Sequence, residues 1–531
     1  MPLPGALAPL RYPVYRLLWT ANLASNIGLW VQNTAAGWMM TSLAPSPAMV
    51  SLVQAASTLP VFLLALPAGA LADIIDRRVY LIGAQIWVTA MALLLALLTG
   101  AGVLGAWGLL VLTFAIGAGQ AMNFPGWAAT TPELVPREDL VQAIALNGVG
   151  FNLSRAVGPA LGGFVIGLAG IQAAFLLAAA SFGSLIVGML FWRREVRRSA
   201  LPPEHFLGAV RAGVRFVAAS PPMRATILRA CVFFFFSAAI WALLPLLVRQ
   251  GLGLGPEAFG LFLTAMGAGA VAAGLLLPSL RARLPTRGAT VLAFSLVGCV
   301  ALALLALVPH WLAAVLGMAL FGVAWIGAAS TLQAAAQMAA PAWVRARAIA
   351  IYQLSFFGAL TLGAVIWGWA GDALGTRAAL GVAAAAGAVG ALAVRGVGLD
   401  RTTRAEPVSS VALPNPEAPA AELARLLAGR SGRVLEVVRY TVLAERRADF
   451  LAAMQEVRRA RLRAGAAVWR LYEDIAHPER FVELWAVESW EEHLREASRL
   501  GPEDRAALAR VAALHAGEEP PEAARYLNVQ P

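Results

Sequence analysis

The chain has 531 residues, of which 59% are hydrophobic and only 13% are charged, and its formal net charge is +11. Because a soluble globular chain carries about a quarter charged residues, this composition excludes an ordinary soluble protein and indicates an integral membrane protein. Every basic residue is an arginine, and the basic excess lies in the apolar part of the chain, so no nucleic-acid partner is needed to explain it. Cys231 and Cys299 lie far apart inside apolar runs, which favours packing roles over a disulfide.

Apolar stretches recur along the first 400 residues, and each is long enough to cross a hydrocarbon core of about 30 Å as a helix. They predict helices at residues 17–40, 48–70, 79–99, 104–124, 140–168, 171–192, 225–248, 257–280, 288–308, 311–338, 345–370 and 376–398. The basic stretch 193–224 divides them into two sets of six. We therefore expect an all-α polytopic membrane protein, with six-helix halves at 1–192 and 225–398 around a central loop at 193–224.

The arginines predict the orientation of these helices. With the N-terminus inside, nearly all loop arginines fall on the cytoplasmic side, and only Arg249 and Arg377 fall outside. This is the positive-inside pattern, and a missed or extra helix would scramble it. Both termini are therefore expected in the cytoplasm. The two helical halves also show weak sequence similarity to each other, which is typical of transporters with a site between two repeats.

A charged segment, GALADIIDRR at 69–78, follows the second apolar stretch. It resembles the loop between helices 2 and 3 of the major facilitator superfamily. The matching or flanking positions are Gly69, Leu71, Ala72, Asp73, Asp76, Arg77 and Arg78, with Ile74 in place of a base and Asp76 in place of a glycine. The resemblance implies that Asp73 accepts hydrogen bonds from the start of helix 11 and latches the cytoplasmic side shut, while the arginine pair lies at the lipid headgroups. A solvated loop without a switching role is the alternative.

Residues 124–163 and the stretch NIGLWVQNTAAGWMM of helix 1 are similar to the enterobactin-exporter branch of that superfamily, also called the transmembrane secretion effector family. The resemblance covers roughly residues 10–400. It includes a Gly-Pro-x-x-Gly-Gly antiporter motif on helix 5, formed by Gly158, Pro159, Gly162 and Gly163. Proline bends a helix and glycines allow tight packing, so a plain packing kink is an equal alternative.

Polar residues within the apolar helices are candidates for a substrate pathway. They are Asn22, Asn26, Asn33, Gln54, Gln120, Asn123, Asn147, Asn152 and Arg155. Hydrogen bonding between helices is the alternative for each amide. Arg155 is different, because an arginine in mid-helix costs about 2.5–3.5 kcal/mol on insertion scales and must face protein or water. It is expected to bind an anionic or catecholate-like substrate, or to clamp Asn152 and a carbonyl.

The C-terminal part changes character. A Pro- and Ala-rich linker is expected at 399–432, followed by a cytoplasmic α+β domain at 433–531 with the order β-α-β-β-α-β of a ferredoxin-like fold. This domain resembles small domains of the antibiotic-biosynthesis-monooxygenase type, which commonly form dimers. Its histidines, His477, His493 and His515, show no metal-ligand spacing, so we expect no metal site. An interaction, dimerisation or ligand-sensing role is expected, with a cofactor-free oxygenase as the alternative.

These features predict a secondary active exporter in the bacterial inner membrane, which moves a siderophore, drug or other amphipathic small molecule by alternating access. Proton antiport follows only from the resemblance, since no Asp or Glu lies in the middle of a predicted span. An importer of a polar solute and a ligand-gated sensor are the alternatives. No cofactor is expected, and ATP is not, because the sequence lacks a phosphate-binding loop and any lysine to complete one.

Overall fold

The computed structural model describes residues 5–192, 206–341, 344–399, 433–490, 493, 496, 499–500, 502–517 and 519–527. They fall into two compact units. The first comprises Met1–Pro202, Thr226–Ala334 and Tyr352–Leu399, and the second comprises Pro203–Ala225, Ala335–Ile351 and Asp400–Pro531. Apart from its first residue, the predicted linker 399–432 lies outside the described residues, as do residues 193–205 of the predicted central loop.

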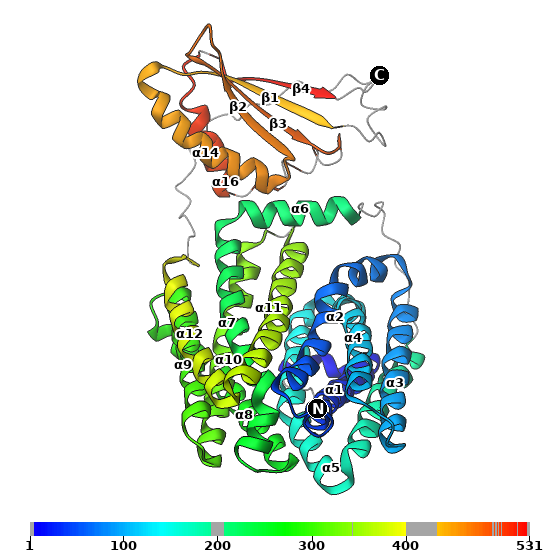
Figure 1. Cartoon of the computed structure of the whole chain (residues 1–531). Helices are drawn as coiled ribbons and strands as arrows, with labels where there is room; N and C mark the ends of the chain where they lie inside the picture. Colours follow the sequence, from blue (N-terminus) through cyan, green and yellow to red (C-terminus); the bar gives the residue numbers. More distant parts are fainter. Residues whose placement is uncertain are drawn as a thin grey trace. The chain divides into compact units, whose positions relative to one another are not determined.

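The N-terminal half is a bundle of long helices (Figure 1). Its elements are η1 (Gly5–Arg11), α1 (Pro13–Leu43), α2 (Pro47–Ile74), α3 (Arg77–Gly100), α4 (Ala106–Leu134), η2 (Arg137–Asp139) and α5 (Leu140–Phe191). The fifth and sixth predicted helices form the single element α5, which is interrupted at Gly170 with φ 84°. Only glycine adopts that left-handed conformation freely, so the chain turns there without a loop.

The chain from Phe206 to Gly396 contains one short helix that the sequence did not predict, followed by the second set of long helices. Its elements are α6 (Phe206–Ala219), α7 (Pro221–Leu246), the π-helical η3 (Leu247–Gly251), α8 (Pro256–Arg283), α9 (Arg287–Leu307), α10 (Trp311–Ala339), α11 (Arg345–Leu374), α12 (Thr376–Ala393) and η4 (Val394–Gly396). The unpredicted helix is α6, which occupies part of the expected central loop.

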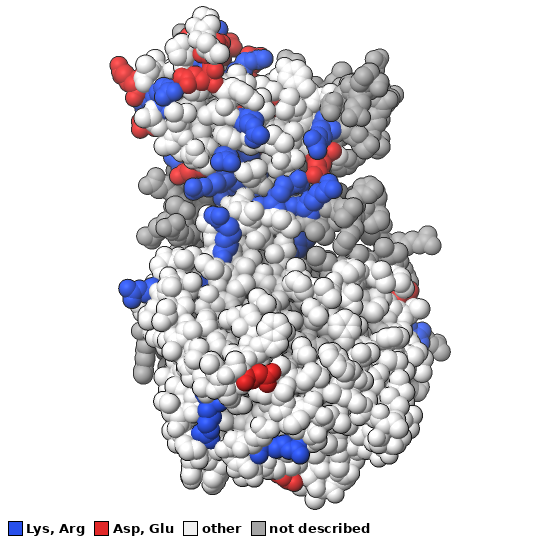
Figure 2. Space-filling model, in the orientation of Figure 1, with Lys and Arg blue, Asp and Glu red and all other residues white. Residues whose placement is uncertain are grey.

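Ten helices among the described residues are long and apolar enough to cross a membrane. They include α5 once, despite its interruption at Gly170, and they do not include α1. Twelve crossings therefore remain a prediction. Figure 2 shows that the visible surface of this helical bundle is largely uncharged, as contact with lipid requires.

The second unit contains a four-stranded antiparallel sheet with strand order β2-β3-β1-β4. Its elements are β1 (Val434–Thr441), η5 (Ala444–Arg446), α14 (Arg447–Ala464), β2 (Val468–Glu473), β3 (Arg480–Val487), α16 (Pro502–Ala512) and β4 (Glu522–Leu527). The helices α14 and α16 cover one face of the sheet (Figure 1). Phe450 and Met454 of α14 pack there against Tyr440, Phe481 and Trp485 of the strands, and this core explains the alternating burial along β3.

Candidate functional site

The two helical halves meet at the end of the bundle where α1 ends and α2 begins, which we call the clasp end. Arg249 of η3 crosses between the halves there. Its Nη1 donates to Oγ1 of Thr41 at 2.8 Å and to Oγ of Ser42, and its guanidinium lies 5.7 Å from the ring centroid of Trp38. The arginine distribution predicts that the clasp end faces outward.

A second contact at the clasp end joins α2 to α11. The backbone N–H of Ala48 donates to a carboxylate oxygen of Asp372 at 3.2 Å, at the start of α2. An anion at a helix N-terminus is favoured by the helix dipole and by unpaired N–H groups. Deeper in the same interface, the hydroxyls of Thr58 and Thr361 lie 2.8 Å apart and both residues are buried.

The helix 5 motif lies at the contact of α5 with both α1 and α8. A Cβ added at Gly163 would lie 2.8 Å from Cα of Gly260 in α8, and one added at Gly158 would lie 2.5 Å from Cβ of Trp30 in α1. A Cβ at Gly162 would lie 3.2 Å from Cβ of Thr34. These approaches are too close for any side chain at Gly158 or Gly163. Pro159 is inside α5, and its carbonyl also approaches Gly260.

The structure describes only part of the predicted gating motif. The structure does not describe the surroundings of Gly69 or the side chains of Ala72, Asp73 and Arg77, so the expected bond from Asp73 to helix 11 stays a prediction. Asp76 is the N-cap of α3, and its Oδ1 accepts from the N–H groups of Arg78 at 3.0 Å and Val79 at 3.2 Å.

Arg78 does not act only at the headgroups as expected. Its guanidinium donates to the carbonyls of Met189 at 3.0 Å and Leu190 at 2.8 Å, near the end of α5. The last carbonyls of a helix lack partners within the helix and readily accept from an arginine. Arg78 therefore joins the start of α3 to the end of α5.

Three of the predicted pathway amides have described hydrogen bonds that serve structure. Asn26 donates to the carbonyl of Asn22, and Asn152 donates to that of Gly148, both within their own helices at 2.9 Å. Asn147 joins helices by donating to Oγ1 of Thr131 at 3.0 Å. The alternative weighed for single amides, hydrogen bonding between helices, therefore describes Asn147, whereas Asn26 and Asn152 bond within their own helices.

Among the remaining pathway amides, Gln120 is buried and Asn123 has a buried side-chain oxygen with no hydrogen-bond partner among the described residues. Asn33 and Gln54 are half-buried. No contact given for these four side chains brings them together, so a continuous polar pathway stays a prediction.

Arg155 is the most unusual member of the predicted set. Only 7% of its surface is exposed, and its Nη2 has no hydrogen-bond partner among the described residues. No hydrogen bond between Arg155 and Asn152 is present among the described residues, where the Asn152 amide donates within its own helix, so the expected clamp stays a prediction. A buried guanidinium is stabilised by an anion or a carbonyl, so Arg155 is a candidate for binding a polar group.

An aromatic cluster that the sequence did not single out lies where the halves meet. The indole of Trp30 in α1 is 5.8 Å from that of Trp241 in α7, and Trp241 is 5.7 Å from Trp325 in α10. Phe234 and Phe356 extend the cluster, with centroids 5.3 and 6.4 Å from Trp325. The indole N–H groups of Trp30 and Trp241 are buried without partners among the described residues. Tryptophan in an apolar span reads as packing, which is why sequence reasoning missed it.

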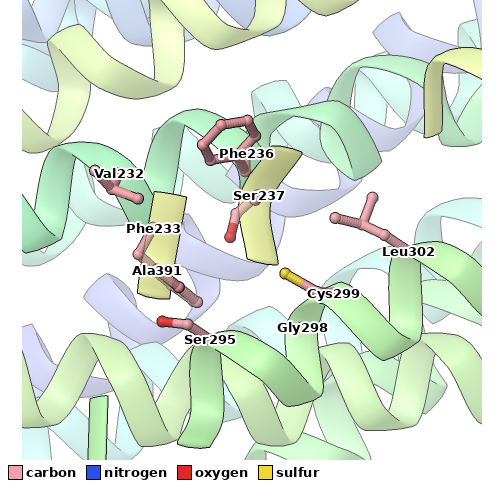
Figure 3. A pocket seen from close by; sticks show the side chains of 10 residues that line it. Val232, Phe233, Phe236, Ser237, Ser295, Gly298, Cys299, Leu302 and Ala391 are labelled. Carbon is pink, nitrogen blue, oxygen red and sulfur yellow. The ribbon is translucent and has the colours of Figure 1, made fainter. Parts of the chain in front are cut away.

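A separate pocket lies within the C-terminal half, between α7, α9 and α12 (Figure 3). Its polar lining consists of Ser237, Ser295 and the thiol of Cys299. A Cβ added at Gly387 would come within 3.2 Å of the Cys299 sulfur, so the helices are closely packed around it. With no buried charge in its lining, this pocket is a packing feature rather than a site for a polar substrate.

The second unit holds a buried polar network beneath its sheet. Glu483 is fully buried and accepts from Tyr440 at 3.0 Å, from Trp469 at 3.0 Å and from Arg461 at 3.3 Å. Burial and the neighbouring carboxylate of Glu483 raise the pKa of Tyr440, so the phenol stays protonated and donates. Arg461 also lies 3.5 Å from the ring centroid of Trp485, as a cation over an aromatic face.

His493 joins this network, although its sequence spacing gave no such signal. Ligand atoms of Glu436, His493 and Glu496 all lie within 4.8 Å of one another, so they could hold a metal ion. Each of these side chains already has a partner: His493 pairs with Glu436, and Glu496 accepts from Arg461 and Trp485. Burial raises the pKa of Glu496 against the opposing effect of Arg461. The network is therefore paired as it stands.

Comparisons with known proteins agree with this arrangement. The profile of the family described as "Transmembrane secretion effector" matches residues 4–531. The MFS-type transporter YfiS of Bacillus subtilis is 27% identical over 250 residues, which are 46% of this chain and 59% of that protein. The enterobactin exporter EntS of Shigella boydii is 32% identical over 209 residues, which are 38% of this chain and 48% of EntS. The chain thus spans about half the length of these curated relatives.

Solved structures support the fold alone, because their sequence identity is low. A bacterial homolog of the human lysosomal transporter Spinster, in an inward-facing and unoccupied conformation, has a TM-score of 0.59 and 13% identity, covering 73% of this chain and 98% of that one. A POT family transporter in complex with a thioalcohol-conjugated peptide has a TM-score of 0.61 and 13% identity, covering 72% and 95%. With the family profile spanning nearly every residue, the chain belongs to the transmembrane secretion effector family of major facilitator superfamily transporters.

Proposed function

We propose that this transporter is a secondary active exporter of an amphipathic small molecule, working by alternating access in the bacterial inner membrane with both termini in the cytoplasm. The observation that carries the proposal is a set of polar contacts that joins the two halves toward the clasp end. Arg249, Asp372 and the Thr58–Thr361 pair join them from the middle of the bundle to the clasp end. Contacts of this kind are suited to closing one side of a central site, as alternating access requires.

The outward direction is supported by the relatives. EntS is by name an enterobactin exporter, and it is 32% identical over the matched region. A siderophore, drug or similar amphipathic compound is therefore the proposed substrate class, and proton antiport is the proposed coupling. The described residues of the membrane helices place no buried carboxylate at mid-span, so the proton carrier is proposed among helix-end acids such as Glu133, Glu257 or Asp372.

The C-terminal unit is proposed to be a ferredoxin-like interaction or ligand-sensing domain. Its strand order and its two helices on one face support that fold. A cofactor-free oxygenase is the second candidate, favoured by the buried Tyr440–Glu483–Arg461 network. Oxygen consumption by the purified full-length chain on quinol-like compounds separates the two. Consumption that is lost in Glu483→Gln identifies an oxygenase.

Alternating access can be tested with a reversible lock. Cysteines replacing Thr58 and Thr361, in a chain whose Cys231 and Cys299 are replaced by serine, would be close enough to form a disulfide across the halves. In inside-out membrane vesicles, the compounds that the protein exports from cells should accumulate in the lumen under reducing conditions. Oxidation should abolish accumulation and reduction should restore it.

The controls for the lock are the two single-cysteine chains, which should transport equally well under both conditions. Unchanged accumulation after complete cross-linking would exclude alternating access at this interface. Accumulation in right-side-out rather than inside-out vesicles would identify an importer, and no accumulation in either would favour a sensor.

A further inference from the structure

The position of Arg155 on α5 directs it toward the interior of the bundle. The preceding residue, Ser154, donates to the carbonyl of Leu23 in α1, and the following residue, Ala156, lies against Gly267 of α8, where an added Cβ would meet Cα of Ala156 at 2.6 Å. Successive residues of a helix are 100° apart. Arg155 therefore points between α1 of one half and α8 of the other.

The aromatic cluster begins one helical turn along α5 from this arginine. Gly158 is one helical turn beyond Arg155 and contacts the Cβ of Trp30, since an added Cβ there would lie 2.5 Å away. From that point the ring of Trp30 reaches across to Trp241 of the other half. Three buried donor groups without described partners, Nη2 of Arg155 and Nε1 of Trp30 and Trp241, thus belong to neighbouring positions of α5, α1 and α7.

We propose that Arg155, Trp30 and Trp241 form the binding site for an aromatic anion. This inference rests on the proposed transporter function and specifies its substrate class. A carboxylate or phenolate would satisfy the guanidinium and the indole N–H groups, and an aromatic ring would pack on the indole faces. The described residues around the site offer no buried carboxylate. An amphipathic cation, the other common class of exported drug, would meet Arg155 without a counter-ion.

The site is built from both halves, which links binding to the transport cycle. Trp30 belongs to the N-terminal half and Trp241 to the C-terminal half, and their separation of 5.8 Å depends on how the halves pack. A ligand that contacts both indoles therefore binds best to one arrangement of the halves. Differential affinity of this kind is what a substrate needs to shift a conformational equilibrium.

The test compares four matched probes on the purified full-length protein by calorimetry: 1-naphthoate, 1-naphthylmethylammonium, the neutral 1-naphthalenemethanol and the non-aromatic cyclohexanecarboxylate. The naphthoate should bind most tightly, and the ammonium probe most weakly of the three naphthyl compounds. Arg155→Gln should weaken naphthoate about 10- to 100-fold, the range of a hydrogen bond to a charged group, and should leave naphthalenemethanol unchanged. Trp241→Leu should weaken all naphthyl probes.

Arg281→Gln is the matched control, because this arginine of α8 donates to Oγ1 of Thr331 at 2.8 Å within its own half. It should leave naphthoate affinity unchanged. Equal affinity of the wild-type protein for the naphthoate and the ammonium probe would overturn the proposal without any variant. So would an Arg155→Gln protein that binds naphthoate normally, which would mean that water satisfies the three donors.

Failure of this inference is distinguishable from failure of the transport proposal. If inside-out vesicles accumulate compounds and the lock is reversible, but the protein shows no preference for aromatic anions, the transport proposal stands and the proposed binding site is excluded. If the protein binds naphthoate selectively but its transport is unaffected by the Thr58–Thr361 lock, the proposed binding site stands and the transport mechanism is excluded.

Discussion

Replacing Arg249 by alanine should open the clasp end of the bundle. The substitution removes the bonds to Thr41 and Ser42 and the cation over Trp38. A cation–π contact at an exposed site contributes about 0.5–1 kcal/mol and a hydrogen bond a net of about 0.5–1.5 kcal/mol. With two hydrogen bonds and one cation–π contact removed, the closed arrangement should lose about 1.5–4 kcal/mol, which multiplies the open-to-closed ratio by roughly 10 to 1,000.

The assay is cysteine labelling at a buried interface position. Thr361 is only 8% exposed and contacts Thr58, so a cysteine there reacts with a membrane-impermeant maleimide only when the clasp end opens. In right-side-out vesicles, Arg249→Ala should raise the labelling rate of Thr361→Cys by that same factor.

Arg377→Ala is the matched control for this experiment. Arg377 carries the same charge at the same end, but it donates to the carbonyl of Gly251 within its own half. Its loss should leave the labelling rate unchanged. Equal rates for the Arg249→Ala and Arg377→Ala proteins would refute the reasoning that Arg249 holds the halves together.

Three further predictions follow from other positions. Asp73→Asn should shift the resting population toward opening at the opposite, cytoplasmic end by about 2- to 5-fold, since a carboxylate at a helix N-terminus contributes about 0.3–1 kcal/mol. Unchanged accessibility of cysteines at both ends of the bundle would show that Asp73 does not hold the cytoplasmic end closed. Gly163→Ala, whose new Cβ would meet Gly260 at 2.8 Å, should raise labelling of a cysteine at the clasp interface, whereas Gly148→Ala, with open space around it, should not; equal labelling in both would contradict the tight crossing. Burial lowers the pKa of His515 below its ordinary value of 6.5, and its Nδ1 accepts from the N–H of Thr441 at 3.0 Å. The stabilisation present above pH 6.5 is then lost as pH falls through the lowered pKa, so the unfolding temperatures of wild type and His515→Ala should converge on acidification; a pH-independent difference would show that this proton plays no part.

The helical part of the fold was predictable because each span must bury about 20 apolar residues in lipid. The predicted ranges 48–70 and 311–338, for example, correspond to α2 (Pro47–Ile74) and α10 (Trp311–Ala339). The sequence did not indicate α6, because its single amphipathic stretch lies among polar residues that read as a loop. In the C-terminal part, alternating and helical periodicities predicted the order of strands and helices, and the structure has that order among its described residues.

The contacts proposed to have a function were harder to predict, because they join residues distant in sequence. Arg249 was interpreted as an ordinary loop charge and Asp372 as a helix-end acid, yet each contacts the other half. Trp30 and Trp241 read as packing residues until their unpartnered N–H groups are considered. The buried position of Arg155 was predictable, because an arginine in the middle of a span is costly in lipid and must face protein or water.

The most direct test of alternating access is a pair of distances measured on the same protein by electron–electron resonance. One spin-label pair, at Ala101 and Val308, reports on the clasp end, and the other, at Ile75 and Pro285, reports on the opposite end; these positions are half-exposed or exposed and lie just beyond α3, α9, α2 and α8. When an exported compound is added, we predict that one distance lengthens while the other shortens. Two distances that stay fixed, or that lengthen together, would contradict a transporter whose halves rock about a central site.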